Sequence, residues 1–561
     1  MLCLLFYTLC AGRCPPGQTI RIPEGTTSIA DRQYEYCVTV DTLIMPDTVT
    51  SIGALAFDTN PIKKVTLSKN LISIGYAAFR NAGFEEIVIP DGVTVLNQET
   101  FYGCSSLKKV TLPKNLKSIH TRCFGKTIVE ELVFPYGLQY IGYEITEENR
   151  CLKRVVIPDS CTSIIFYAFA GCSGLQEIIL PKGIKALNES LFSGTALRNC
   201  TIPDTVEIIG PSCFSRTDLK TISIPPKVIQ IGKNAFYKCW ALESITFEGN
   251  NLKEIGQLAF SHCGRLKRLT FPSSLVNVSM DVCEECNVLR TVVIQCDLKA
   301  FVYYGDTLSY GHFTELKTLV YESNTPIPER NNFSIFRIQT LIINNSNLES
   351  MGDIPDAYRL STIVIVDPSS KFTFSPSLRK DITLNISISR SIKGFTENVF
   401  ENVSIDTFIY CGKSISDNSF LKNSKGFKKV ITSSAFRGET IGGVKISEKT
   451  DQCTQLIPFE VKYQEESGSE EPEKTNEPEK SSPATASSNN NNQDNSGGNN
   501  EENDSSKDGK GKGKGGKIAG GIIGAILILA AIAVIAFFIY KYKIHKSEND
   551  SEEQHVELSL V

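Results

Sequence analysis

The sequence predicts a β-rich solenoid, a right-handed superhelix with a parallel sheet, followed by a single transmembrane α-helix. Three observations lead to this prediction. A strand-like motif recurs every 22 to 24 residues, a second apolar motif recurs in fixed phase with it, and an uncharged apolar segment lies near the C-terminus. At 561 residues the chain is too long for one compact core, so a repeat array or several domains are expected.

Each repeat opens with a short core in which apolar and polar residues alternate, as in Lys64-Val-Thr-Leu67, and a proline usually follows. Proline has no backbone N–H, so it ends the strand ladder there. A period of this size is typical of a solenoid, in which each turn buries its apolar face only by stacking on its neighbours. The regular cores begin at Thr19, Thr42, Lys64, Glu86, Lys109, Glu131, Arg154, Glu177, Asn199, Thr221, Ser244, Arg268 and Thr291.

The second motif of each repeat reads Ile-Gly-x-x-Ala-Phe, for example from Ile52 to Phe57 and from Ile231 to Phe236. We expect the glycine to permit a backbone turn that a Cβ atom would hinder. The Ala-Phe pair would then place one small and one large apolar side chain in the interior.

Together these motifs resemble the BspA-like (Treponema-type) leucine-rich repeat, Leu-x-x-Ile-x-Ile-Pro-x-x-Val-x-x-Ile-Gly-x-x-Ala-Phe-x-x-Cys. The match runs from about Ile20 to Ile294. The resemblance implies a leucine-rich-repeat solenoid with an extracellular role in adhesion or recognition. A chain of this kind with a C-terminal span is similar to the surface proteins of trichomonad parasites. The resemblance implies no catalytic residue.

We assign residues 13–300 to regular repeats and residues 301–450 to degenerate ones. The later cores begin at Thr318, Thr340, Thr362, Thr383, Thr407 and Lys429 and keep a spacing near 22 residues, but most lack the second motif. A separate small β domain is the alternative, and the regular spacing argues against it.

The two ends of the chain predict membrane targeting. Residues 1–12 read as a secretory signal peptide. The segment from Ile518 to Tyr540 has no charged residue, and at about 1.5 Å per residue it is long enough to cross a bilayer as a helix. We therefore expect a single-pass plasma-membrane protein with its N-terminal part extracellular and residues 541–561 as a cytoplasmic tail.

Residues 451–517 are predicted to form a disordered stalk. From Glu465 to Lys517 the chain contains no aromatic residue and no Val, Ile, Leu or Met, so it cannot bury enough apolar surface to fold. Within the span, Gly520 and Gly524 form a G-x-x-x-G pair. This pair fits a homodimer through the membrane helix and fits the ordinary abundance of small residues in spans equally well.

The outward side chains of the predicted sheet supply the candidate binding site. Their first column alternates in charge, ending in Glu131, Arg154 and Glu177, which fits either self-neutralisation, our preferred interpretation, or a charged docking surface. In the second column, Val133, Val156 and Ile179 are consecutive. β-propensity alone could account for them, but exposed apolar strips often mark binding surfaces. We predict a partner-binding site made of Val133, Val156, Ile179, Arg154 and Glu177.

The cysteines mostly occupy repeat slots, so we expect small buried core residues. Stacked turns would also bring Cys239 and Cys263 close enough to pair in an oxidising compartment. Cys283 and Cys286 match C-x-x-C, but no second C-x-x-C follows at finger spacing, so we interpret them as core residues. Candidate glycosylation sites in Asn-x-Ser/Thr triplets are Asn188, Asn199, Asn277, Asn332, Asn344, Asn385 and Asn402.

The amino-acid composition argues against two classes of function, nucleic-acid binding and metal or acid–base catalysis. The chain has 58 Lys+Arg against 62 Asp+Glu, which gives no basic excess for nucleic acid, and only five histidines for metal or acid–base chemistry. We predict a non-enzymatic adhesion or recognition receptor for an extracellular protein, matrix or cell-surface ligand, with no cofactor, metal or catalytic site. The alternatives are a passive glycosylated coat protein and, less favoured, a surface hydrolase with paired carboxylates.

Overall fold

The computed structural model describes residues 14, 18–279, 281–302, 316–323, 325, 338–350, 359–376, 378, 380–415, 420–421 and 423–457. The chain divides into two units, Met1–Gln464 and Glu465–Val561, and all described residues belong to the first. Four predicted segments lie outside the described residues: the signal peptide, the part of the stalk that begins at residue 458, the transmembrane span and the cytoplasmic tail. In the described part, no helix is long and apolar enough to cross a membrane.

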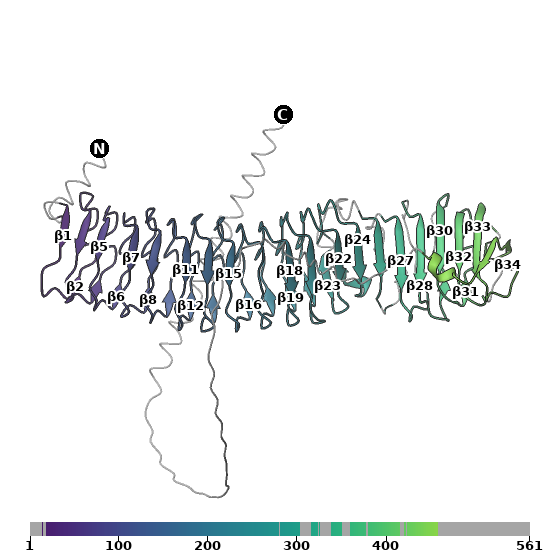
Figure 1. Ribbon diagram of the computed structural model, residues 1–561, viewed down its shortest axis with the longest axis horizontal. Coiled ribbons are helices and arrows are strands. Elements are labelled where there is room, and N and C mark those ends of the chain that lie inside the picture. The colour runs from purple at the N-terminus through teal and green to yellow at the C-terminus, as the bar shows by residue number, and fades with distance from the viewer. Residues whose placement is uncertain are drawn as a thin grey trace, which may run out of the picture. The chain divides into compact units, whose positions relative to one another are not determined.

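Within the first unit, short strands stack in chain order in two rows, and nearly every regular turn contributes one strand to each row (Figure 1). We call the members of the first row the first strands. Every core predicted from the sequence is a first strand except residues 199–202. The first strands are β1 (Thr19–Arg21), β3 (Thr42–Ile44), β5 (Lys64–Thr66), β7 (Glu86–Val88), β9 (Lys109–Thr111), β11 (Glu131–Val133), β13 (Arg154–Val156), β15 (Glu177–Ile179), β18 (Thr221–Ile224), β20 (Ser244–Phe247), β22 (Arg268–Phe271), β24 (Thr291–Ile294), β26 (Thr318–Tyr321), β27 (Thr340–Asn344), β28 (Thr362–Val366), β30 (Thr383–Ile388), β32 (Ser404–Tyr410), β33 (Gly426–Ser433) and β36 (Glu448–Thr450).

The second strands lie about nine residues later in each regular turn, where the sequence reads Ser-Ile or a similar pair ahead of the glycine. They are β2 (Ser28–Ile29), β4 (Ser51–Ile52), β6 (Ser73–Ile74), β8 (Val95–Leu96), β10 (Ser118–Ile119), β12 (Tyr140–Ile141), β14 (Ser163–Ile164), β16 (Ala186–Leu187), β17 (Ile208–Ile209), β19 (Gln230–Ile231), β21 (Glu254–Ile255), β23 (Asn277–Ser279), β25 (Phe301–Val302), β29 (Thr373–Phe374) and β31 (Gly394–Phe395).

The first strands pair in parallel, as predicted, but they do not form one continuous sheet. The second strands, where the sequence had predicted only a turn, also pair in parallel. The hydrogen-bonded groups of the first strands are β1–β3–β5, β7–β9, β11–β13–β15, β18–β20 and a nine-stranded sheet from β22 to β36. The N-terminal strands are three or four residues long and the C-terminal ones reach eight. The degenerate repeats therefore carry the more extensive sheet, although their sequence matches the repeat pattern less well.

A column of aromatic rings fills the interior, which confirms the predicted role of the Ala-Phe motif. Ring centroids of successive turns lie 5.3 to 6.3 Å apart, from Tyr34 through Phe124 and again from Phe169 through Phe260. Between the two runs, the position of the ring in the repeat is occupied by Thr146, whose hydroxyl donates a hydrogen bond to the carbonyl of Ala168. Stacked rings bury a large apolar area and add about 0.5–1.5 kcal/mol per pair.

The recurrent glycine has a different role from the one predicted. At Gly75 and Gly232 φ is not positive, and a Cβ atom would lie 2.6 Å from backbone nitrogen of the preceding turn. Glycine is therefore needed for close stacking of the turns. The positive φ angles fall instead on ordinary residues two places before and two places after the Phe slot, such as Asn234 at 56° and Lys238 at 58°.

Most cysteines are buried free thiols in repeat slots, as predicted. The Sγ atoms of Cys104, Cys239 and Cys263 each donate to a phenylalanine carbonyl of the preceding turn, at 3.0 to 3.3 Å. Cys239 and Cys263 do not pair with each other. The disulfides join Cys14 to Cys37 and Cys411 to Cys453, at the two ends of the described solenoid.

The C-terminal end closes with the antiparallel hairpin of β34 (Thr440–Ile441) and β35 (Val444–Lys445) and with the 3-10 helix η3 (Cys453–Leu456). A second 3-10 turn, η1 (Leu298–Ala300), precedes β25. Because η3 packs on β32 and β33 and is held by the Cys411–Cys453 bond, the folded chain continues to Ile457, seven residues past the predicted boundary at 450.

Candidate functional site

The predicted binding residues lie side by side on the exposed face of the sheet formed by β11, β13 and β15. Val133 pairs in register with Val156, and Val156 with Ile179. Val133 is 51% exposed and Ile179 44% exposed, while Val156 between them is partly buried by its neighbours. The three side chains thus form a contiguous apolar strip, which we call the valine strip. Val88 on β7 lies in the same column and is more exposed still.

Charged residues border the valine strip on one side. Arg154 lies between two carboxylates, with Nη1 2.7 Å from Glu131 Oε1 and Nε 3.1 Å from Glu177 Oε2. Arg154 donates both of these hydrogen bonds, and they, above all the one to Glu131, raise the pKa of Arg154. The group carries a net negative charge on an exposed surface, where solvent screens each ion pair and keeps its contribution to stability small.

The predicted alternating charge column is only partly an ion-pair ladder. Besides the Arg154 group, Lys109 lies 4.0 Å from Glu86. In the described turns no ion pair joins Lys64 to Glu86 or Lys109 to Glu131, and those are the places where the strands are not paired. A second ladder one residue earlier joins Lys108 to Glu85 and Lys153 to Glu130.

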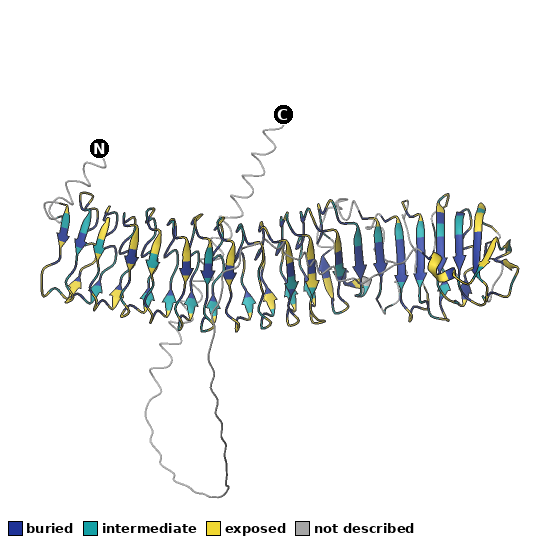
Figure 2. Cartoon of the chain, in the orientation of Figure 1, coloured by how far each residue is buried: buried dark blue, intermediate teal, exposed yellow. Residues whose placement is uncertain are grey.

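The second outward column changes environment along the chain, which the sequence did not predict. Its residues on β7, β11 and β15 are exposed, and those on β20 and β22 are threonines that are at most partly buried. From β24 to β33 the column is buried and, apart from Ser387 on β30, apolar, starting with Val293 at 0% exposed. The repeat phase places Val293 in the same outward slot as Val133 and so predicts it on the open face, and at Val293 this prediction is wrong. Figure 2 shows the change from exposed to buried strands.

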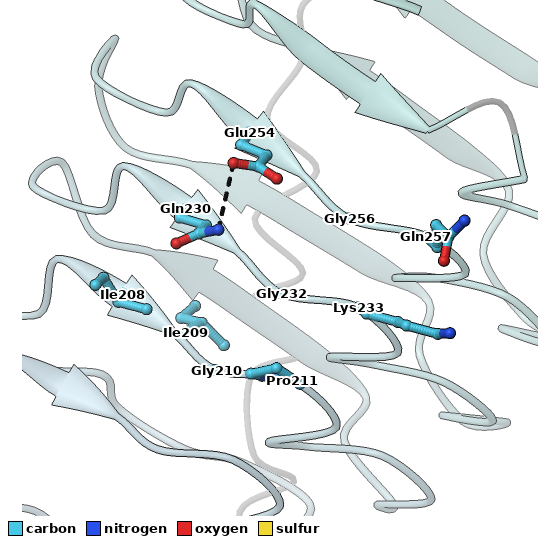
Figure 3. A pocket seen from close by; sticks show the side chains of 10 residues that line it. All are labelled: Ile208, Ile209, Gly210, Pro211, Gln230, Gly232, Lys233, Glu254, Gly256 and Gln257. Atoms are coloured by element: carbon cyan, nitrogen blue, oxygen red, sulfur yellow. Dashed lines mark hydrogen bonds between the residues drawn. The ribbon is translucent and has the colours of Figure 1, made fainter. Parts of the chain in front are cut away.

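The row of second strands carries a shallow groove of about 350 Å³ lined by residues of three successive turns (Figure 3). Gly210, Gly232 and Gly256 line it at equivalent positions of the three turns. Gln230 Nε2 donates to Glu254 Oε2 at 3.3 Å along one side. The groove has no buried charged group aimed into it, so its lining indicates no particular chemistry.

An exposed aromatic cluster lies where the second-strand row turns back toward the first. Trp240 is 55% exposed and meets the ring of His262 edge-on at 5.6 Å, and Tyr237 lies 5.3 Å from the same ring. Lys238 Nζ lies 5.1 Å from the Tyr237 centroid. These residues were not among the sites predicted from the sequence, although the single tryptophan of the chain was an available signal.

The glycosylation candidates differ in how their amide nitrogen is used. Asn188 Nδ2 donates to the carbonyl of Ile164, and Asn344 Nδ2 donates to Glu322, so these two nitrogens are engaged in contacts between turns. Asn199 and Asn277 are exposed. Asn385 and Asn402 are partly buried, and Asn332 lies outside the described residues.

The described part of the chain holds no group of three or more His, Cys, Asp or Glu that could bind a metal ion. Cys283 and Cys286 are both buried in repeat slots, and Cys286 donates to the carbonyl of Phe260. Burial raises the pKa of Cys104 and Cys172 to about 12, which keeps these thiols protonated.

Comparison with known families fits this architecture. Six copies of the BspA type leucine rich repeat region match the chain, over residues 27–153, 147–250, 185–305 and 229–354. Together the matched ranges span more than half of the 561 residues. The chain belongs to the BspA-type leucine-rich-repeat family. The family match extends beyond residue 300, so it includes turns that the sequence pattern alone had marked as degenerate.

A curated relative of this BspA-type protein is described as a putative BspA-like surface protein of Trichomonas vaginalis. It is 28% identical over 169 residues, which is 30% of this chain and 25% of the relative. The match thus spans a quarter of the relative's length. The relative shares the repeat type of this chain, and its name places it at a surface.

Solved structures of other leucine-rich-repeat proteins are also similar. One from Bacteroides ovatus is 24% identical, with a TM-score of 0.44, and the match covers 64% of this chain and 91% of that one. A leucine rich cell surface protein from Faecalibacterium prausnitzii is 23% identical with a TM-score of 0.31, covering 52% of this chain and 89% of the other. At these identities the similarity concerns the fold alone.

Proposed function

We propose that this BspA-type protein is a cell-surface recognition protein that binds a protein partner through the valine strip. The observation that supports this most is the in-register row of β-branched residues Val133, Val156 and Ile179 on adjacent strands, in which Val133 and Ile179 are exposed and Val156 is partly buried. A contiguous apolar patch on an otherwise polar surface is costly to leave in water. An incoming apolar side chain would recover that cost by covering it.

The charged border supports specificity. Glu131, Arg154 and Glu177 stand beside the strip in a fixed order of charge, minus, plus, minus. A partner with basic groups spaced like the two glutamates would gain complementary contacts, and charge complementarity favours one partner and one register over others. The proposal also places the chain in a membrane, with the segment from Ile518 to Tyr540 as its anchor and the repeats outside the cell.

The test compares binding by the full chain and by two triple variants to intact cells and to immobilised matrix proteins. The first variant carries Val133→Glu, Val156→Lys and Ile179→Glu. The matched control carries Ile72→Glu, Ile229→Lys and Val276→Glu, which are exposed β-branched residues next to second strands, 61%, 44% and 60% exposed.

We expect saturable binding by the parent and the control and at least a tenfold loss of affinity in the first variant. Equal loss in both variants, or none in either, would exclude the valine strip as the site. Absence of saturable binding by the parent would favour the alternative of a passive coat protein. Steady turnover of a glycoside or peptide panel, removed by one carboxylate substitution, would favour the surface hydrolase.

A further inference from the structure

The exposed aromatic cluster of Tyr237, Trp240 and His262 has the shape of a corner. The ring planes of Trp240 and His262 meet at 84°, with their centroids 5.6 Å apart, and Tyr237 meets the same imidazole at 63° and 5.3 Å. Trp240 is nevertheless 55% exposed. The indole and the imidazole therefore form two walls at nearly a right angle, and more than half of Trp240 is accessible to a ligand.

The imidazole wall is held in place from behind. Ser261 is fully buried, and its Oγ lies 2.8 Å from His262 Nδ1. The backbone N–H of His262 donates to the carbonyl of Glu284 in the next turn, also at 2.8 Å. Because Nδ1 is engaged by the serine, Nε2 is the ring nitrogen that can meet a ligand. The corner thus combines an aromatic surface with a fixed polar atom, a combination typical of small-molecule sites.

The turn that follows leaves room beside the indole. Gly264 is the counterpart of Trp240 in that turn, since each residue follows a buried cysteine of the repeat. A Cβ atom at Gly264 would lie 3.8 Å from Trp240 Cε3, and among the described residues only Trp240 and the chain neighbours come within 4 Å of it. The φ angle of Gly264 is not in the left-handed region, so the backbone does not require glycine here. The missing side chain leaves a space against the indole.

The aromatic cluster lies among charges that balance. At the positions of Lys238 and Trp240 and their counterparts in the neighbouring turns, two basic residues, Arg216 and Lys238, are matched by two acidic ones, Asp218 and Glu285. Lys238 Nζ also lies 5.1 Å from the Tyr237 centroid, so the protein's own cation takes this aromatic face. Balanced charges select neither a phosphate or sulfate group nor a cation. The cluster therefore suits a neutral ligand.

A pyranose ring matches this combination of surfaces. One face of the ring presents C–H groups, whose slight positive charge is attracted to the negative face of an indole. Its edge presents hydroxyl groups, which both donate and accept hydrogen bonds, so His262 Nε2 and the exposed Asp218 can serve them. An apolar protein segment fits less well, because the exposed Ile229 and Val276 of the nearby turns precede second strands and do not adjoin Trp240 in the repeat.

We propose that the aromatic cluster binds one sugar ring of a neutral glycan. The C–H face of the ring lies on the indole of Trp240, over the space left by Gly264, and a hydroxyl group meets His262 Nε2. The site lies on other turns than the valine strip and uses none of its residues. It gives the protein a second binding surface, for carbohydrate.

The first test uses the single tryptophan of the chain, because the intrinsic tryptophan fluorescence of the full chain reports on Trp240 alone. The probes are maltohexaose, chitotetraose and N-acetyllactosamine, titrated separately in a detergent without sugar head groups. We expect a saturable change of fluorescence with at least one of them, since each presents pyranose C–H faces. No change with any of the three up to about 10 mM, where even millimolar affinity is detected, would overturn the proposal.

The second test fills the space beside the indole while it keeps the tryptophan. Gly264→Leu should weaken sugar binding at least tenfold with an unchanged circular dichroism spectrum, because its Cβ starts at ordinary contact distance from the indole. The matched control is Gly183→Leu, at a glycine whose Cβ position has no atom within 4 Å, and it should bind like the parent. The triple variant of the valine strip should also bind like the parent. Parent-like affinity in Gly264→Leu or in His262→Ala would overturn this placement of the ring.

Salt dependence separates a neutral ligand from an anionic one. Heparin hexasaccharide and a short single-stranded RNA are the anionic probes, and binding to both should be weaker than to the neutral sugars. We expect the affinity for the neutral sugars to stay the same at low and high salt. Tighter binding of an anionic probe that is lost at high salt would assign the cluster to an anionic ligand and overturn the proposal.

Discussion

The aromatic column makes a quantitative prediction about stability at Phe236. Its ring is fully buried and stacks on Phe214 at 5.3 Å and on Phe260 at 5.5 Å. Phe236→Ala removes the transfer free energy of the side chain and leaves a cavity, which typically costs about 3–5 kcal/mol. Because two ring contacts of about 0.5–1.5 kcal/mol are lost with it, we expect a value near the upper end, about 4–5 kcal/mol.

The assay is urea unfolding of the full chain, followed by circular dichroism and by limited proteolysis. Each solenoid turn contacts only its neighbours, so a break at one turn should also separate the unfolding of the N-terminal and C-terminal turns. Tyr136→Ala, at an aromatic residue that is 86% exposed, is the control and should stay within about 0.5 kcal/mol of the parent. A loss below about 1 kcal/mol for Phe236→Ala would refute the view that the column holds the turns together.

Three further predictions concern thiols and charges. In the native chain a thiol reagent should modify Cys151 first, since it is the exposed free cysteine of the described part, and Cys151→Ser should remove that early label. Arg80→Met should lower the free energy of unfolding in urea by about 3–5 kcal/mol, because it leaves the fully buried Asp58 carboxylate without its 2.7 Å ion pair. An unchanged midpoint of urea unfolding would contradict this prediction. The hydrogen bond from Lys153 lowers the pKa of Glu130, so its contribution to stability is present above the unfolded-state pKa near 4 and is lost as the pH falls below it. Lys153→Met should therefore flatten the fall in stability between about pH 5 and 3, and an identical pH profile would argue against the pair.

The repeat pattern alone predicted most of the architecture of this protein. The positions of the first strands, the buried aromatic slot and the cysteine slots follow from the period, because each turn repeats one local code and is stabilised by its neighbours. The code failed at residues 199–202, which lie in sequence phase but form no strand. It also could not predict that the glycines serve close stacking, since that depends on the distance between turns.

Other features depended on contacts that no periodicity encodes. Val133 and Val293 occupy the same slot of the repeat with the same side chain, yet one is 51% exposed and the other 0%. The sequence around each slot predicts which face of the sheet the side chain points to. Whether that side chain is exposed depends on whether another part of the chain covers it. The pairing of cysteines is similar: Cys411 and Cys453 are 42 residues apart and bonded, whereas Cys239 and Cys263, one turn apart, are not. Local sequence thus determined the turns of this solenoid, and only the tertiary structure decided which of its surfaces are open, because burial is a property of contacts between segments far apart in the chain.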